Sequence, residues 1–308
     1  MMVKALFRDS SDLLNSPVDL RVRAEEDGYL FLRDVLPKDL VRELRTQFLE
    51  ICASYGWLEQ GSDGLSGRAD TAAIGDIPVD EIAFCGVGIP RQAYEDVQRL
   101  ELFHAIAHHP SLLAVYSSLF GEKVLPHPRN IARIMLPIAS NSPTPPHQDF
   151  IHIQGTVDVW TCWFPVGDCP EELGGLSVLR GSHKEGLLPV QKAEGAGNLE
   201  VVLCQWEDDW VSGPMAAGDI LTFSSRTVHR ARPNLMDATI RLSCDYRFQP
   251  ADGEIEEKSL QPHCQVLSWD DIYRNWGNED LKYYWQKENL KLSPWDETLR
   301  WQKARICD

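Results

Sequence analysis

Short apolar stretches separated by turn residues fill the chain from Val124 to Phe248, and they limit its possible folds more than any other feature. No helical period lies between them, so consecutive strands must pack directly on one another. This pattern is typical of a sandwich or a jelly roll, and it predicts a mainly β, cupin-like core over residues 124–250. The predicted strands are Ile131–Leu136, Phe150–Ile153, Asp158–Val166, Leu176–Leu179, Val201–Leu203, Ile220–Phe223 and Arg241–Phe248.

Residues 25–120 carry the helical period instead, and they are expected to form a layer of helices on one sheet of the core. Pro37 opens the first long helix, at a position where the missing N–H of proline does no harm. Residues 1–24 are polar and are predicted to be an irregular arm. The predicted elements of this layer are a strand at Asp27–Leu32 and helices at Pro37–Tyr55, Glu101–His109 and Ser111–Phe120.

Two further segments have two interpretations each. Residues 59–90 are rich in glycine and aspartate, so they form either a mobile surface loop or a lid over an active site.

Residues 251–308 hold five of the ten tryptophans among charged residues. They are predicted to be a helical extension packed on the core. A homo-oligomer interface is the alternative, because exposed aromatic clusters mark interaction surfaces. All 308 residues are assigned to one domain.

Charge and cysteine usage narrow the class of protein. A net charge of −16 disfavours nucleic acid and anionic membranes as partners, since both need a basic surface. The sequence has no apolar run of membrane-spanning length, and its N-terminus lacks the apolar segment of a secretory signal. The eight cysteines are scattered without a Cys-x-x-Cys pair, which predicts reduced thiols in a cytoplasmic protein.

His147 and Asp149 lie in Pro-Pro-His-Gln-Asp-Phe and are spaced i, i+2. On a strand this spacing puts both side chains on one face. The remote His229, in Thr-Val-His-Arg, can complete a facial triad that leaves three positions of an octahedral iron(II) open. A His-x-Asp pair alone is a weak signal, because a surface histidine and aspartate at a strand end give the same pattern.

Arg241 follows His229 by twelve residues and begins the last predicted strand. Its planar guanidinium can hold the far carboxylate of a dicarboxylic co-substrate through two hydrogen bonds, a geometry that lysine cannot match. Ser243 lies on the same face of that strand and can add a hydroxyl donor. Arg247, farther along the strand, is the competing candidate.

Several motifs together are more specific than the triad alone: His147-Gln148-Asp149, Gly174–Lys184 with its Gly-Ser-His-Lys end, Gly218–Phe223, His229 with Pro233-Asn234, and Arg241. On these residues the chain resembles the phytanoyl-CoA dioxygenase family of iron(II)- and 2-oxoglutarate-dependent oxygenases, from about Glu25 to Phe248. The resemblance implies a double-stranded β-helix whose open end holds Fe(II) between His147, Asp149 and His229. It also implies 2-oxoglutarate as co-substrate, with its distal carboxylate at Arg241, and O₂ as oxidant.

The resemblance also implies roles for residues around the triad. Trp163 occupies the position where relatives place a tryptophan against the co-substrate, and Trp160 is the alternative. Arg133 either contacts the co-substrate or is solvated at a strand edge. His183 is expected to be structural, because the Gly-Ser-His segment closes a turn in the family. Strand parity, and not the resemblance, predicts that His152 is no metal ligand, since it lies three residues after Asp149. The residues expected to face the iron and the substrate are Gln148, Phe150, Trp160 and Tyr246.

By resemblance, the reaction is hydroxylation of a small molecule coupled to oxidative decarboxylation of 2-oxoglutarate, which releases succinate and CO₂. The carboxylate at position 149 favours hydroxylation or a related oxidation such as desaturation, because halogenating relatives have a small residue there. Two alternatives stay open: a metal-dependent cupin-type enzyme that does not use 2-oxoglutarate, and a non-catalytic metal-binding scaffold. The substrate is not identified, because pocket residues lie in loops that the fold does not fix.

Overall fold

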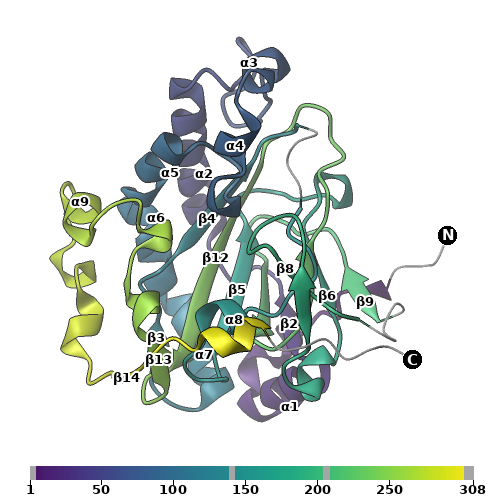
Figure 1. The fold of residues 1–308 in the computed structure, drawn as a ribbon, viewed down its shortest axis with the longest axis vertical. Coiled ribbons are helices and arrows are strands. Elements are labelled where there is room, and N and C mark those ends of the chain that lie inside the picture. Colours follow the sequence, from purple (N-terminus) through teal and green to yellow (C-terminus); the bar gives the residue numbers. More distant parts are fainter. Residues whose placement is uncertain (1–4, 139–142, 204–208, 302–308) are drawn as a thin grey trace.

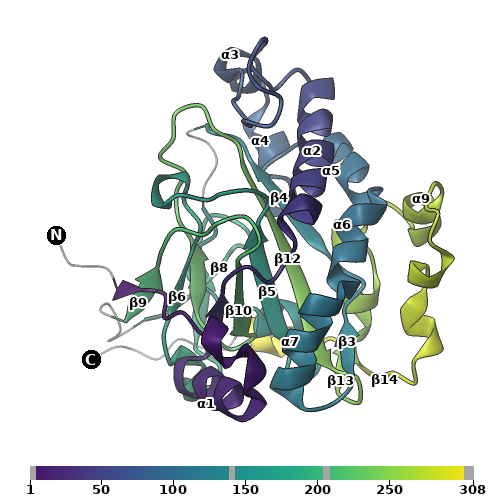
Figure 2. The same ribbon diagram turned by 180° about the vertical axis from the view of Figure 1, so that it is seen from behind.

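Two β-sheets form the centre of the molecule, and helices cover the outer face of the larger sheet (Figures 1 and 2). A computed structural model describes residues 5–138, 143–203 and 209–301. Most neighbouring strands are antiparallel. The larger sheet has the order β2 (Tyr29–Leu32), β10 (Ile220–Ser224), β5 (Trp160–Pro165), β12 (Arg241–Pro250), β3 (Val124–Pro126), with β4 (Ile131–Met135) also paired to β12.

The smaller sheet packs its inner face on the larger one. The order of its strands is β1 (Ala5–Leu6), β9 (Trp210–Ser212), β6 (Leu176–Leu179), β11 (His229–Ala231). Trp163 and Phe223 from the larger sheet meet Val178 and Val211 from the smaller one in a single buried cluster. Two short strand pairs lie apart from these sheets: β7 (Val190–Lys192) with β8 (Leu199–Val201), and β13 (Glu254–Glu256) with β14 (Lys291–Ser293).

Strand β12 separates the helical side of the molecule from the inner face of the sheets. Its even-numbered residues, such as Tyr246 and Phe248, pack in the cluster that the helices bury. Its odd-numbered residues carry the polar groups and point to the other side, because successive side chains of a strand alternate. The polar row is Arg241, Ser243, Asp245, Arg247 and Gln249.

The helices bury apolar stripes on the outer face of the larger sheet. Tyr116 stacks on Phe248 with the ring centroids 3.9 Å apart, and its hydroxyl bonds Thr222 at 2.7 Å. These helices are α1 (Pro17–Asp27), α2 (Lys38–Ser54), α3 (Thr71–Gly75), α4 (Val79–Ile82), α5 (Arg91–Gln98), α6 (Glu101–Ala105) and α7 (Pro110–Phe120). Helix α8 (Phe150–Ile153) packs instead beside the smaller sheet, and α9 (Trp269–Tyr273) lies in the C-terminal extension.

The helices predicted at 37–55 and 111–120 are present as α2 and α7, and most of the predicted strands are present within a few residues. Two predictions are wrong. Residues 150–153 form helix α8 and not a strand. Residues 17–27, expected to lie in and beside an irregular arm, form helix α1. The exposed Val18 and Val22 blur its amphipathic pattern, while Leu20 and Ala24 are buried.

The C-terminal extension packs its aromatic residues within the chain. Trp269, Trp276 and Trp285 form a buried cluster with Tyr273. The indole N–H of Trp276 donates to the carbonyl of Arg99, at the end of α5, at 2.9 Å. These three tryptophans are therefore not the exposed cluster on which the oligomer alternative rested. The extension consists mainly of short 3₁₀ turns around α9.

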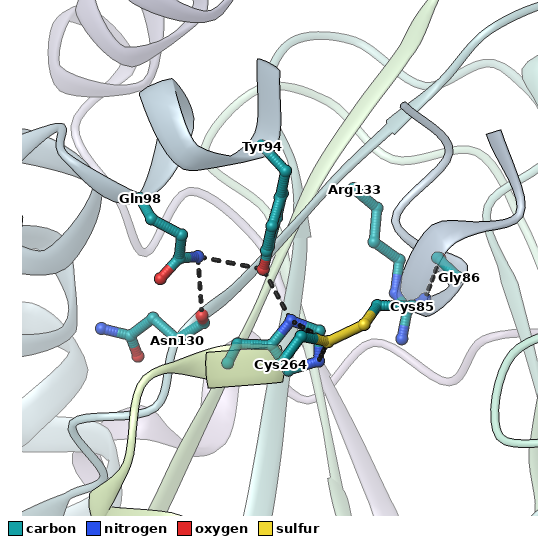
Figure 3. The surroundings of a disulfide bond; sticks show 8 residues. Cys85, Gly86, Tyr94, Gln98, Asn130, Arg133 and Cys264 are labelled. Atoms are coloured by element: carbon teal, nitrogen blue, oxygen red, sulfur yellow. Dashed lines mark hydrogen bonds between the residues drawn. A yellow bond between two sulfur atoms is a disulfide. The ribbon is translucent and has the colours of Figure 1, made fainter. Parts of the chain in front are cut away.

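A disulfide joins Cys85 to Cys264 and ties the 59–90 segment to the C-terminal extension (Figure 3). The expectation of reduced thiols is therefore wrong for these two cysteines, which lie far apart in sequence and give no short-spacing signal. The cytoplasmic location, which rested on the cysteine pattern and on the N-terminal sequence together, stays a prediction. The free thiols among the described residues are buried at Cys52, Cys162, Cys169 and Cys244. Among the same residues, no helix is both long and apolar enough to cross a membrane.

Loss of the disulfide should destabilise the fold measurably. Replacing Cys85 by serine should lower the free energy of unfolding by about 2–4 kcal/mol, because the bond closes a very long loop in the unfolded chain. Urea denaturation with and without dithiothreitol measures the change. The reductant should destabilise the unaltered protein and have no further effect on Cys85→Ser. Equal urea midpoints for the unaltered protein with and without reductant would show that the disulfide is not present.

Candidate metal centre

His147, Asp149 and His229 converge on one point. Each offers one ligand atom, and these atoms lie within 4.8 Å of one another. Oδ1 of Asp149 is 3.5 Å from Nε2 of His147 and 3.7 Å from Nε2 of His229. All three residues are buried. Such distances leave room for one ion between the three atoms.

The backbone brings the two histidines together directly. His147 and His229 exchange two N–H···O=C hydrogen bonds, each 3.0 Å long, as an isolated antiparallel bridge at the start of β11. Asp149 is not on a strand, because its φ of −62° and ψ of −30° are helical and it precedes α8. The structure therefore brings His147 and Asp149 together, but the i, i+2 strand geometry predicted for the pair does not hold at Asp149.

Both imidazoles are oriented by backbone carbonyls. Nδ1 of His147 lies 2.8 Å from the carbonyl of Pro145, and Nδ1 of His229 lies 3.1 Å from that of Thr227. A carbonyl only accepts, so each Nδ1 is the protonated donor and each Nε2 keeps its lone pair for the centre. Burial lowers the pKa of His229 to about 3, so this imidazole is neutral and ready to ligate at neutral pH.

Asp149 presents one oxygen to the imidazoles and the other to the protein. Oδ2 accepts a 2.5 Å hydrogen bond from Oγ1 of Thr161, and Nη2 of Arg247 lies 3.5 Å from the same oxygen. Burial by itself would raise the pKa of Asp149, but Arg247 and the imidazoles outweigh it and hold the pKa well below its usual value. The carboxylate is therefore ionised, with Oδ1 facing the centre. Two neutral imidazoles and one carboxylate are a donor set that suits iron(II).

Replacing Thr161 by valine should weaken iron(II) binding by about 10–100-fold, because the hydroxyl that holds Oδ2 of Asp149 is lost while the shape is kept. Calorimetric titration of the metal-free protein with iron(II), without O₂, measures the change. Thr161 was not predicted from the sequence, although its place on β5 two residues before Trp163 puts both on the inner face. A variant that binds iron as tightly as the unaltered protein would show that this hydrogen bond is dispensable.

Arg241 and Ser243 lie side by side on the inner face of β12. Nη1 of Arg241 donates to the carbonyls of Gly174 and Arg232. Burial lowers the pKa of Arg241 to about 10, which leaves it charged at neutral pH. Among the described residues, neither Nε of Arg241 nor Oγ of Ser243 has a hydrogen-bond partner. Buried polar atoms without partners are costly, so this pair points to a polar ligand.

The other two predicted co-substrate residues differ in their surroundings. Trp163 is fully buried between the sheets, on the inner face of β5. Arg133 is engaged by the protein, because its Nε pairs with Asp245 at 2.9 Å and its Nη1 donates to the carbonyl of Gly86 at 2.6 Å (Figure 3). Arg133 is therefore not a solvated edge residue.

Three of the four proposed substrate residues do not point into the centre. The amide of Gln148 bonds backbone atoms of Gly186, Leu188 and Arg226, and so joins loops. Tyr246 points to the helices, where its hydroxyl donates to the carbonyl of Phe103.

Trp160 packs against the same helix-facing cluster as Tyr246. The strand parity of Trp160 and Tyr246, and the full set of amide bonds of Gln148, turn these three side chains away from the centre. The parity follows from alternation along the strands, whereas the contacts of Gln148 could not be predicted from the sequence. Phe150 is buried directly after Asp149.

Comparison with known proteins finds one matching family model and related enzymes from two Streptomyces species. The model of the family described as "Phytanoyl-CoA dioxygenase (PhyH)" matches residues 24–242. A "1-deoxypentalenic acid 11-beta-hydroxylase" of Streptomyces arenae is 29% identical over 271 residues, which are 83% of this chain and 89% of the relative. The enzyme of the same name from Streptomyces exfoliatus is 28% identical over 270 residues, with the same two shares.

Two solved structures share the fold. The epimerase SnoN, in complex with Fe³⁺, alpha ketoglutarate and nogalamycin RO, superposes with a TM-score of 0.54 at 21% identity, over 78% of this chain and 86% of that one. The alpha ketoglutarate dependent carbocyclase SnoK from nogalamycin biosynthesis gives 0.53 at 20% identity, over 85% and 94%. At these identities the likeness establishes the fold alone.

Proposed function

Because this chain belongs to the phytanoyl-CoA dioxygenase family, we propose that it hydroxylates a small organic acid with O₂ and 2-oxoglutarate. The chain is an iron(II)- and 2-oxoglutarate-dependent oxygenase. The observation that carries the proposal is a buried His-Asp-His cluster on the same inner face as a buried arginine whose Nε has no partner among the described residues. Neither a cupin-type enzyme without 2-oxoglutarate nor a scaffold needs that arginine.

Each residue of the centre has a defined task in this proposal. His147, Asp149 and His229 would hold iron(II), and Arg241 with Ser243 would bind the distal carboxylate of 2-oxoglutarate. Once bound, iron(II) and 2-oxoglutarate would supply oxidative chemistry with O₂, in which one oxygen atom goes to succinate as CO₂ leaves and the other to a C–H bond of the substrate. The apolar side chains between the sheets, among them Trp163, exclude water from the reacting atoms.

The substrate class follows from the relatives. Both hydroxylases are named for 1-deoxypentalenic acid, and their match spans most of both chains. An organic acid with a large hydrocarbon part is therefore the first candidate substrate. Epimerisation and carbocycle formation on the same fold mean that hydroxylation has to be tested against other oxidations.

The architecture supports a jelly-roll, double-stranded β-helix core. Two packed sheets with mostly antiparallel neighbours, and a metal centre between strand ends, are the support for this assignment. We assign residues 1–308 to one dioxygenase domain, with a helical layer at 25–120, the core at 124–250 and an extension at 251–308.

Succinate formation tests the proposed function. Metal-free protein is loaded with iron(II) without O₂, mixed with 2-oxoglutarate and 1-deoxypentalenic acid, and exposed to air. Succinate and a product heavier by one oxygen atom are expected in equal amounts. Turnover without any need for 2-oxoglutarate would favour the cupin-type enzyme. Iron-loaded protein that forms neither succinate nor product with any of a panel of organic acids would favour the scaffold.

A further inference from the structure

Arg247 is a second inward-facing guanidinium on β12, six residues after Arg241. Its side chain is 9% exposed. The contact of its Nη2 with Oδ2 of Asp149, at 3.5 Å, is longer than the 2.7–2.9 Å typical of a charge-assisted hydrogen bond. Its Nε is buried and has no partner among the described residues. Arg247 is thus a buried cation that the protein pairs only weakly.

Three other ionisable side chains near Arg247 do not pair with it. Arg133 pairs with Asp245 at 2.9 Å. Arg129 lies in the field of Glu256, which is buried. His127, beside Arg247, is neutral because burial lowers its pKa to about 3. None of these groups supplies an anion to Arg247.

A bound metal and co-substrate would not supply one either. The two charges of iron(II) and the charge of Arg241 would balance those of Asp149 and of dianionic 2-oxoglutarate. Once Oδ1 of Asp149 faces a metal, that carboxylate has less charge to offer Arg247. One buried positive charge then remains unmatched, which costs several kcal/mol unless an anion arrives.

We propose that Arg247 binds the carboxylate of the substrate beside the metal centre and so selects monoanionic substrates. This inference rests on the proposed function and adds the residue that recognises the acid. The planar guanidinium accommodates a carboxylate through Nε and one Nη together, and Nε is the atom that lacks a partner. The substrate carbon to be oxidised would be set by its distance from that carboxylate.

A simpler role for Arg247 is to hold Asp149 in place. Replacing Arg247 by an uncharged residue distinguishes the two roles, because each role predicts the loss of a different property. If Arg247 only positions Asp149, Arg247→Gln weakens iron(II) binding and leaves the preference for acids intact. If Arg247 binds the substrate, Arg247→Gln removes the preference for acids in protein that is kept saturated with iron(II) and 2-oxoglutarate.

Binding of matched acids and methyl esters to the anaerobic iron(II)–2-oxoglutarate protein tests the proposal. The probes are acetate, cyclohexanecarboxylate and abietate with their methyl esters, measured by calorimetry. At least one acid should bind at least tenfold more tightly than its ester. Arg247→Gln should abolish the difference and Arg247→Lys should keep part of it. If Arg247→Gln does not fold, the reduced preference for acids expected of Arg247→Lys tests the proposal in its place.

Arg230→Gln is the matched control. Arg230 lies on β11 directly after His229, but its guanidinium sits over the ring of Trp210, 4.1 Å from its centroid. This variant should keep the full preference for acids. Esters that bind as well as acids, an acid preference that survives in Arg247→Gln, or no binding by any acid would overturn the proposal. Protein that fails to bind iron(II) with 2-oxoglutarate would instead overturn the proposed function, at an earlier step of the experiment.

Discussion

Replacing His229 by alanine should abolish stable iron(II) binding and 2-oxoglutarate turnover together. The change removes one of three protein ligands and leaves a cavity between His147 and Phe223, whose ring centroid is 4.3 Å from that of His229. Loss of a residue that hydrogen-bonds a metal ligand typically lowers metal affinity by about 10–100-fold. Loss of a ligand itself should therefore lower it on the order of 100-fold or more. Bound iron is measured by elemental analysis, affinity by calorimetry and turnover by succinate.

His183→Ala is the control for this experiment. His183 is also a buried imidazole, but its Nε2 lies 3.1 Å from the carbonyl of Glu25, far along the chain from the triad. The control should lose some stability and keep its iron. A His229→Ala protein that still holds one equivalent of iron with unchanged affinity would show that the triad is not the metal site.

Replacing Arg241 by alanine should raise the KM for 2-oxoglutarate by about 30- to 5000-fold and leave iron(II) affinity nearly unchanged. Truncating one partner of a buried, hydrogen-bonded charge pair costs about 2–5 kcal/mol, because the other charge stays buried without a partner. Arg241→Lys should recover part of the loss, since the charge returns without the planar geometry. Initial rates of succinate formation at varied 2-oxoglutarate give the KM.

A stability measurement has to accompany the Arg241 variants, because Arg241 also donates to the carbonyls of Gly174 and Arg232. Arg232→Ala is a suitable control. Arg232 is a neighbouring arginine that pairs with Glu171 at 2.9 Å, and its loss should leave the KM for 2-oxoglutarate unchanged. A folded Arg241→Ala protein with an unchanged KM would place the co-substrate carboxylate elsewhere, with Arg247 as the first alternative.

The predictable part of the centre lies on regular strands. Alternation along residues 241–250 places Arg241 and Ser243 on one face, and the structure keeps both on the inner face of β12. The same alternation applied to β12 and β5 would have assigned Tyr246 and Trp160 to the helical side. The position of Asp149 was less predictable. It precedes α8, and a helix of four residues is too short to show a helical period in the sequence.

Contacts between segments that lie far apart in the chain could not be predicted from the sequence. The hydroxyl of Thr161 reaches Asp149 only because β5 lies beside the turn into α8. The disulfide between Cys85 and Cys264 depends on how the C-terminal extension packs, and no local spacing encodes it. Helix α1 was missed because two of its valines face solvent.

A crystal structure of the protein with iron(II) and 2-oxoglutarate, grown without O₂, would locate the metal and the co-substrate. We expect a single iron bound by Nε2 of His147, Nε2 of His229 and Oδ1 of Asp149, with the distal carboxylate of the keto acid on Arg241. Iron bound by other residues, or a keto acid whose distal carboxylate lies away from Arg241, would contradict this expectation.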